Sequence, residues 1–585
     1  MKSGYDRFPA IKVPVTETDY AVEGWTAIGR ELRQRITACG KRKCVICVDL
    51  YHGVWENAVL GALRAELTPT DVIETREANK AKAQIQAMVY PDVGEDRVFG
   101  YLSRLVADDY FDEAKVTALK VRLAAINEGV VLVYGVAASV CCPKPDILVY
   151  ADMARWEIQL RFRGGELSNW CSDNAGEDAL RLYKRAFFVD WRALDRHKRR
   201  LYDRIDYILD TNGDEPKLMT GAAFRRGLDV AAARPFRVKP YFDPGVWGGQ
   251  WMKEKFGLDP SAKNYAWSFD CVPEENSLLF DIGGTVVETP AINLVFRRPR
   301  ELLGEAVHAR FGAEFPIRFD MLDTMKGGNL SLQCHPLTEY IQETFGMRYT
   351  QDESYYLLDA DASTSPCVYL GVRTGVKKAE LAEALEQVER TGTFEAERFV
   401  NAFPAKRHDH FLIPGGTVHC SGANCMVLEI SATPYIFTFK MWDWGRIGLD
   451  GRPRPIHVKH ALANIQFDRD TEWVRRNLVG RVETVSERPG VKEERTGLHE
   501  REFIETRRHW FTVPVEHDTA GGVNVLNLVE GEEATVESPT GAFEPFVVHY
   551  AETFIVPAAV GRYVIRPTGP NADRPHATIK AYVRT

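Results

Sequence analysis

The stretch LSLQCHP, residues 330–336, alternates apolar and polar side chains, which predicts a β-strand with one buried face. Side chains two residues apart share a face, so Gln333 and His335 point the same way. Further along, TQDESYYLLDA places Glu353 at the start of another expected strand, and FLIPGGTVHCSG places His419 after a Pro-Gly-Gly turn. One amide oxygen, two imidazoles and one carboxylate suit a divalent cation, Zn²⁺ first. Taken singly, each residue also suits a structural role: a polar strand face, a satisfied buried carboxylate, or a histidine in a turn.

The sequence on both sides of this stretch has a residue pattern typical of β-strands. From about Pro235, short runs of Val, Ile, Phe and Tyr recur between Gly, Pro and Asp turns, and a further block of such runs follows Val482. Short strands with regular turn signals are typical of a sandwich or a barrel. A helical pattern interrupts the first block at KKAELAEALEQVER, residues 377–390.

The N-terminal part has a different pattern. Between residues 23 and 212, buried strands such as VICVDLY (45–51) and VVLVYGVA (130–137) alternate with amphipathic helical stretches. This alternation predicts a parallel sheet covered by helices. The expected fold class is therefore multidomain, an α/β domain followed by β domains with a helical insert. The expected division is 1–225, 226–480 and 481–585.

Composition narrows the function classes. The 585 residues carry 74 basic and 82 acidic side chains, a net charge of −8, and are 45% hydrophobic, as in ordinary globular proteins. The acidic balance argues against nucleic acid as a partner. We find no apolar run near the length that crosses a membrane and no signal peptide. Eleven cysteines, including the adjacent Cys141 and Cys142, suit free thiols in the cytoplasm.

Four ordered motifs resemble those of type I phosphomannose isomerases, a zinc-dependent cupin family. They are LSLQCHP, the acidic Glu353, IPGGTVHCSG (413–422), and DWGR (443–446) followed by GRPRPIHVKHAL (451–462). The similarity begins near Pro240 and continues into the final β block. It implies a bicupin (jelly-roll) architecture, with the last block as a second barrel without a metal.

The resemblance also implies a ligand set and a reaction. The implied activity is the interconversion of mannose 6-phosphate and fructose 6-phosphate, or of a related sugar phosphate, with Zn²⁺ as cofactor and the sugar phosphate as small-molecule partner. The sequence leaves homo-oligomerisation open. The implied metal ligands are Gln333, His335, Glu353 and His419.

The reaction moves a proton between C1 and C2, so it needs charge stabilisation, a base and a phosphate anchor. Arg446 of DWGR is the expected active-site arginine. Glu429, in the strand after His419, is the candidate base; the alternative is that it orients a metal ligand. Lys459 and Arg348 are the expected substrate-binding residues.

Some positions depart from the family pattern. Gln351 stands where a lysine is common, Asp320 lies near another such position, and the segment YAWSFD (265–270) lacks the expected Glu. Isomerisation is therefore better supported than mannose 6-phosphate as the substrate, and a non-catalytic sugar or sugar-phosphate sensor is the alternative. Replacement positive charge is available from Arg318, Lys326 and Arg348.

Residues 23–212 resemble a P-loop nucleoside kinase in outline. Phosphate binding there needs GxxxxGK[ST], but the turn DLYHGVWENAVLGAL (49–63) has Gly53 and no following Gly-Lys-Ser/Thr. We expect a kinase-like fold that has lost catalysis. A kinase with unfamiliar phosphate chemistry, using Asp49 and His52, is the less favoured alternative.

Overall fold

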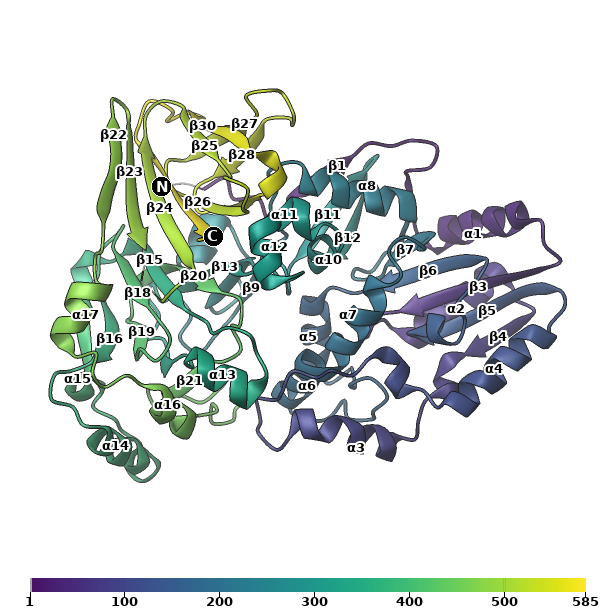
Figure 1. Ribbon diagram of the computed structural model, residues 1–585, viewed down its shortest axis with the longest axis horizontal. Coiled ribbons are helices and arrows are strands. Elements are labelled where there is room, and N and C mark those ends of the chain that lie inside the picture. The colour runs from purple at the N-terminus through teal and green to yellow at the C-terminus, as the bar shows by residue number, and fades with distance from the viewer. Residues whose placement is uncertain (1–2, 498, 500) are drawn as a thin grey trace. The chain divides into compact units, whose positions relative to one another are not determined.

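The computed structural model describes residues 3–497, 499 and 501–585, and the side chains of 389–391 lie outside this description. The chain forms two compact units, each described here by itself (Figure 1). The α/β unit comprises Ala10–Ala231 and Ser277–Arg297, and the β unit comprises Met1–Pro9, Ala232–Asn276 and Arg298–Thr585. The architecture is thus multidomain and mixed α/β.

The α/β unit contains the predicted parallel sheet. Its strand order is β2-β8-β7-β6-β3-β5-β4, in which β3 to β7 run parallel and, at one edge, β8 pairs antiparallel with both β7 and β2. The central strand β3 (Lys43–Leu50) is buried along almost its whole length, which explains its continuous apolar run. The other strands of this sheet are β2 (Ala21–Glu23), β4 (Asp71–Glu74), β5 (Gly129–Val136), β6 (Ile147–Asp152), β7 (Tyr207–Asp210) and β8 (Lys217–Thr220).

Helices connect these strands, as the alternating pattern requires (Figure 1). The α-helices of the unit are α1 (Trp25–Cys39), α2 (Glu56–Leu67), α3 (Lys82–Val93), α4 (Glu113–Ala125), α5 (Arg155–Arg163), α6 (Ala179–Arg185), α7 (Trp191–Arg199), α8 (Gly221–Ala232) and α10 (Ile292–Arg297). Shorter turns are η1 (Thr75–Ala78), η2 (Ala107–Tyr110), η3 (Ala138–Val140) and η4 (Ala186–Asp190), the last a π-helix.

A segment from the middle of the chain, Ser277–Arg297, belongs to this α/β unit, although it lies inside the predicted division 226–480 that holds the metal ligands. It forms a hairpin of β11 (Ser277–Ile282) and β12 (Thr285–Pro290), and β11 also pairs in parallel with β1 (Ala10–Val13). The two-residue turn is Gly283-Gly284, both with positive φ, as a tight hairpin needs. Asn293 of this segment then donates a 2.8 Å hydrogen bond to Asp152, which anchors the segment on the sheet.

The β unit contains two pairs of antiparallel sheets. The first pair has the strand orders β18-β15-β20-β13-β10-β9 and β17-β16-β19-β14-β21. The strands are β9 (Tyr241–Asp243), β10 (Trp267–Cys271), β13 (Ile317–Asp323), β14 (Leu332–Cys334), β15 (Glu353–Ala360), β16 (Cys367–Val372), β17 (Val400–Pro404), β18 (His410–Ile413), β19 (His419–Ser421), β20 (Cys425–Ala432) and β21 (Phe439–Trp442).

The β unit also contains helices. The predicted insert at 377–390 is helix α14 (Lys378–Thr391), which confirms that prediction. The others are α9 (Trp251–Phe256), α11 (Pro299–Leu303), α12 (Glu305–Phe311), α13 (Thr338–Phe345), α15 (Ala396–Phe399), α16 (Val458–Asn464) and α17 (Thr471–Leu478), with the turn η5 (Ala362–Thr364).

The second pair forms the C-terminal barrel. Its sheets have the orders β22-β23-β24-β31-β26-β29 and β25-β30-β27-β28. Phe511, Leu526, Leu528 and Tyr563 lie in its buried apolar core. The elements are β22 (Glu483–Arg488), β23 (Val491–Gly497), β24 (Ile504–Phe511), β25 (Val515–Asp518), β26 (Asn524–Glu530), β27 (Glu533–Glu537), β28 (Phe546–His549), β29 (Thr553–Val556), η6 (Ala558–Val560), β30 (Arg562–Thr568) and β31 (His576–Val583).

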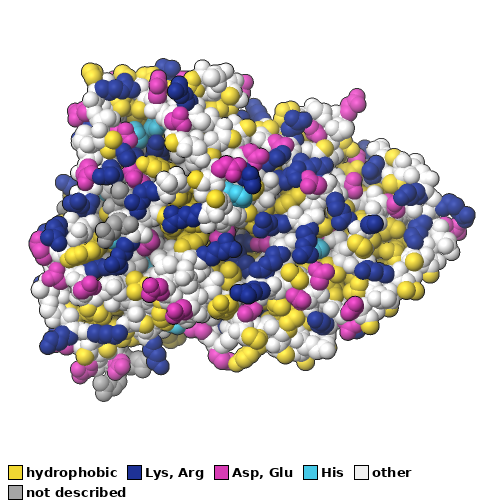
Figure 2. All heavy atoms as spheres, in the orientation of Figure 1, with side chains coloured by type: hydrophobic (Ala, Val, Ile, Leu, Met, Phe, Trp, Pro, Cys, Tyr) yellow, Lys and Arg dark blue, Asp and Glu magenta, His cyan; other side chains and the backbone are white. Residues whose placement is uncertain are grey.

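The surface is mixed in character. On the face drawn in Figure 2, basic and acidic side chains are interspersed among apolar ones. Within the described residues, no helix combines the length and the apolar character that crossing a bilayer requires.

A buried ion cluster ties the C-terminal barrel to the rest of the β unit. Arg237 is 3% exposed and lies 2.5 Å from Glu552 and 3.7 Å from Asp270, both of which are also buried. Removing the cation would leave two buried carboxylates without their partner, which is far more costly than losing a surface pair.

We therefore expect Arg237→Ala to lower the free energy of unfolding by about 3–5 kcal/mol, measured by urea denaturation. The matched control is Arg566→Ala, which breaks a partly exposed pair with Glu537 at 3.1 Å. Its expected cost is about 0–1 kcal/mol. Equal losses in the two variants would contradict a special role for the buried cluster.

Candidate metal centre

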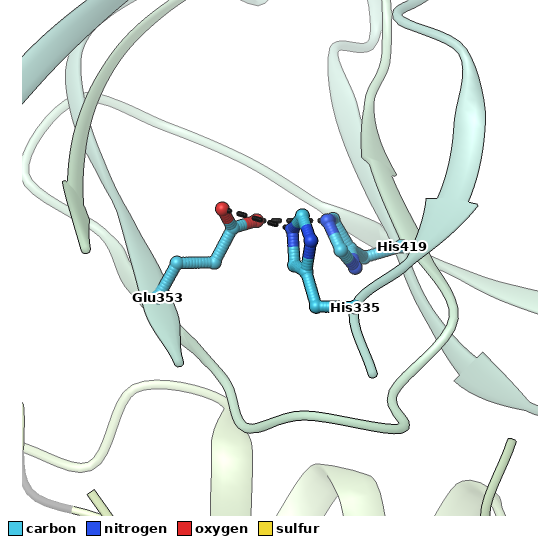
Figure 3. Close-up of side chains that lie close together, drawn as sticks. All are labelled: His335, Glu353 and His419. Carbon is cyan, nitrogen blue, oxygen red and sulfur yellow. Dashed lines mark ion pairs between the residues drawn. The ribbon is translucent and has the colours of Figure 1, made fainter. Parts of the chain in front are cut away.

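Three predicted ligands meet between the first pair of sheets. His335 directly follows β14 and His419 begins β19, in one sheet, whereas Glu353 begins β15 in the other. The carboxylate of Glu353 faces both imidazoles, with Oε2 3.2 Å from Nε2 of His335 and Oε1 2.7 Å from Nε2 of His419 (Figure 3). All three residues are at most 2% exposed. The two sheets therefore face each other, and the ligands project into the space they enclose.

The hydrogen bonds of the two histidines prepare them for a metal. Nδ1 of His335 lies 3.2 Å from the carbonyl of Phe437, and Nδ1 of His419 lies 2.9 Å from the carbonyl of Thr417. A carbonyl only accepts, so each Nδ1 carries the proton and each Nε2 presents its lone pair. Such a bond on the second nitrogen is usual for metal-binding histidines.

The atoms that face one another lack ordinary partners. Among the described residues, Nε2 of His335 and Oε1 of Glu353 are buried without a hydrogen-bond partner, although buried polar atoms are nearly always satisfied. Burial opposes ionisation of Glu353, but when a proton occupies Nε2 of His335 or His419, the facing positive charge lowers the pKa of Glu353 well below the ordinary value, so it is a carboxylate. Two imidazole lone pairs and a carboxylate within 4.8 Å of one another fit a divalent cation.

Gln333 lies beside this trio, as predicted. It is 7% exposed and pairs across the sheet with His419. Its Nε2 is 3.3 Å from Nε2 of His419. A half turn of the amide presents the oxygen at the same place, where it can act as a further ligand.

Glu429 is connected to the ligands through one amide group. Nε2 of Gln351 donates to Oε2 of Glu353 and to Oε1 of Glu429, each at 3.1 Å. Arg318 donates to the same Oε1 of Glu429 at 3.1 Å. Burial, and secondarily the charge of Glu353, raise the pKa of Glu429 to about 7, although Arg318 opposes the shift.

Arg318 supplies a positive charge next to the ligands. Gln351 stands where the resemblance implies a lysine, so Arg318 is a candidate for the replacement charge. In β13, Arg318 and Asp320 share a face and lie opposite Ser431 and Glu429 of β20. Arg318 is 5% exposed, pairs with both Asp320 and Glu429, and covers the ring of Tyr435. The alternation of IRFDMLD indicates this shared face, but it does not say that the face meets the metal ligands.

Arg446 lies near the ligands but makes its contacts elsewhere. Its guanidinium binds Asp443 at 2.5 Å and the carbonyl of Asn329 at 2.6 Å. Ser331, two residues before Gln333, donates to the same Asp443 at 2.7 Å. Arg454 also binds Asp443, at 2.9 Å, so Arg446 and Arg454 share this one carboxylate. Arg454 lies in the motif GRPRPIH and is not among the predicted site residues.

The two expected substrate-binding residues are not brought to this site. The Arg348 side chain is 66% exposed and lies 3.6 Å from Glu314. Lys459 is exposed on α16. Both charges lie near the relevant motifs in sequence, but their side chains point to solvent, where long charged groups are best hydrated.

Comparisons with known proteins give one family match and several relatives. A family described as a domain of unknown function (DUF8485) matches residues 24–233. Mannose-6-phosphate isomerase of Streptococcus mutans is 25% identical over 232 residues, 39% of this chain and 67% of that protein. Mannose-6-phosphate isomerase ManA of Bacillus subtilis is 24% identical over 233 residues, 40% of this chain and 68% of that protein.

Among solved structures, the mannose 6-phosphate isomerase from Bacillus subtilis is similar over 60% of this chain and 100% of its own, with 18% identity and a TM-score of 0.49. The match spans about two thirds of the length of each of these sequence relatives. The ordered motifs of the chain lie in the β unit. Over about 40% of its length, the chain is thus similar in sequence to mannose-6-phosphate isomerases.

Proposed function

We propose that the protein is a divalent-metal-dependent isomerase that interconverts an aldose phosphate and a ketose phosphate. Mannose 6-phosphate and fructose 6-phosphate are the first candidate pair, and Zn²⁺ is the first candidate metal. The observation that carries the proposal is the convergence of Nε2 of His335, Nε2 of His419 and the Glu353 carboxylate. The names of the sequence relatives support the same reaction. The two sheet pairs of the β unit are proposed to be cupin barrels, and the division at about residues 225 and 480 stays a prediction.

The proposed ligands are the trio together with Gln333. When bound there, a divalent cation supplies Lewis-acid stabilisation of the negative charge that develops on the sugar oxygens. The backbone carbonyls behind both histidines hold the rings in place, so the site is preorganised before substrate arrives.

Glu429 is the proposed base. It would take the proton from C2 of the aldose and return it to C1, so one group serves as base and then as acid. A pKa raised to about 7 by burial and by Glu353 suits both directions of this transfer. Arg318 and Gln351 hold the carboxylate by bonds to Oε1, which leaves Oε2 for the substrate proton.

Phosphate anchoring is proposed for Arg446 and Arg454 in place of Lys459 and Arg348. The two guanidiniums share one carboxylate, Asp443, so the pair retains positive charge. Arginine forks match phosphate oxygens well. Ser331, two residues before Gln333, donates a hydrogen bond to the same Asp443, which supports a phosphate anchor near the proposed ligands.

The test combines metal analysis with isomerase assays over a panel of hexose and pentose phosphates. We expect bound divalent metal, turnover of at least one sugar phosphate, loss of turnover on chelation, and recovery on adding Zn²⁺. Tight binding of a sugar phosphate by the metal-loaded protein without turnover would instead support the sensor function.

The α/β unit is proposed to be a kinase-like fold without phosphoryl-transfer activity. At the carboxyl ends of its strands, where ligands of such sheets bind, buried side chains pair with one another. Asp49 accepts 2.9 Å hydrogen bonds from the Ser139 amide and His197 Nε2, and Lys198 lies 3.2 Å from Asp152. These pairs occupy charges that a nucleotide phosphate would otherwise use.

We therefore expect millimolar MgATP to leave the melting temperature of the full-length protein unchanged, because a ligand stabilises only in proportion to its binding to the folded state. Differential scanning fluorimetry measures this, with an active P-loop kinase as the positive control. A saturable rise with ATP concentration would restore the kinase alternative, with Asp49 and His52 as its first candidates.

A further inference from the structure

A second group of polar side chains lies inside the C-terminal barrel. In β24, His509 and Arg507 share a face with Phe511, whose side chain lies in the barrel core. His509 pairs across the sheet with Glu493 of β23, and Arg507 pairs with Lys580 of β31. These residues therefore face the barrel interior, on strands that carry none of the proposed metal ligands.

Two histidines from facing sheets meet there. The rings of His509 and His517 lie with centroids 4.5 Å apart, and Tyr563 stacks on His517 at 5.0 Å. The histidines are 4% and 6% exposed. Within the described part of the chain, Nδ1 of His509 and Nε2 of His517 are buried and have no hydrogen-bond partner.

Buried imidazole nitrogens without hydrogen-bond partners lower the stability of the fold, so their presence points to a bound partner. Burial lowers the pKa of both histidines, and the charge of Lys580 lowers both further, so the rings are neutral. A neutral imidazole offers one N–H donor and one lone pair, the complement of a hydroxyl group. A buried polar atom without a partner costs about 1–3 kcal/mol, so such atoms usually have a ligand or water.

Lys580 adds an unpaired positive charge to the same place. Among the described residues its ammonium makes no hydrogen bond or close ion pair, and its closest recorded contact is the ring of Tyr582 at 5.5 Å. The nearby carboxylates are already engaged, because Arg507 binds Glu493 at 3.1 Å and also binds Glu505. Lys580 is partly exposed, whereas both histidines are buried.

We propose that His509, His517 and Lys580 form a second ligand site, which binds a small hydroxylated anion such as a sugar phosphate or a sugar acid. Lys580 would face the phosphate or carboxylate, and the imidazole nitrogens would bond hydroxyl groups. A divalent cation fits less well, because Lys580 would repel it and Arg507 holds the Glu493 carboxylate. The site does not depend on the metal centre.

The test is isothermal titration calorimetry on the full-length protein carrying His335→Ala, which impairs the metal centre. The probes are mannose 6-phosphate, gluconate and inorganic phosphate, with mannose as the uncharged control. We expect mannose 6-phosphate or gluconate to bind more tightly than inorganic phosphate and mannose. The two organic anions separate a phosphate site from a carboxylate site.

Adding Lys580→Met, which keeps length and removes charge, is expected to weaken that binding at least about tenfold, the effect of a lost charged contact. Lys492→Met is the matched control, because Lys492 lies on the neighbouring strand β23, pairs with Glu494 and is expected to leave binding unchanged. His517→Asn is a second variant of the proposed site, and melting curves verify that each variant is folded. Absence of anion binding in the His335→Ala protein, or equal binding with and without Lys580, would overturn the proposal.

Discussion

Replacing His335 by alanine is expected to empty the metal centre and to abolish isomerase turnover. The Nε2 of His335 is buried, lacks a hydrogen-bond partner and lies 3.2 Å from the Glu353 carboxylate. A bound metal ion would therefore be the partner of this nitrogen. Lewis-acid stabilisation is worth several kcal/mol, so we expect kcat to fall at least about 10³-fold. Metal content per chain, measured by mass spectrometry, should fall in parallel.

The matched control is His308→Ala, a partly exposed histidine on α12 of the same unit. It should retain both metal and activity. Full activity in a His335→Ala protein that has lost its metal would contradict the metal-dependent mechanism. Full metal content in that variant would show that the ligand set is wrong.

Replacing Glu429 by glutamine is expected to separate chemistry from metal binding. The amide is nearly isosteric and can still accept from Arg318 and Gln351, so the network around Glu353 should survive. It cannot accept a proton from carbon, and a positioned base contributes about 10²–10⁴-fold to rate. We expect kcat to fall by that factor while the metal content stays unchanged.

The pH profile gives an independent readout of the same group. Burial, and next the charge of Glu353, raise the pKa of Glu429 to about 7. A base must be deprotonated to accept a proton, so kcat/KM should fall as the pH is lowered through the pKa of Glu429. A bound cation would move this limb to lower pH, because positive charge favours the carboxylate.

In Glu429→Gln that acidic limb should be absent, whereas Glu339→Gln, a change at an exposed position on α13, should leave the profile as it is. If Glu429→Gln loses metal along with activity, Glu429 orients the ligands and the base must be sought elsewhere. These two results distinguish the alternatives that the sequence leaves open for this residue.

Much of the ligand set is readable in the sequence because each ligand has a local signature. Period two places Gln333 and His335 on one strand face, and the turn before His419 positions that ring at the start of β19. Both histidines lie against Glu353 across the space between two sheets. The local pattern was enough to predict these orientations, because a one-residue shift in strand register would expose the whole apolar face of the strand.

Charged groups were harder to predict. Lys459 and Arg348 lie close to the quoted motifs in sequence but are exposed, whereas Arg318 is buried against Glu429 and Arg454 is partly buried against Asp443. A long cationic side chain reaches several neighbours, and its position depends on which carboxylate is nearest in space. Linear distance from a motif does not contain that information.

The sequence by itself determined the strand and helix periods, the helical insert, and the order of the proposed ligands. Only the tertiary structure decided that Ser277–Arg297 joins the α/β unit, and that Arg318, Gln351 and Glu429 meet beside the Glu353 carboxylate. The physical reason is the same in both cases. Periodicity states which face of an element is buried, but which buried faces meet depends on packing between residues far apart in the chain.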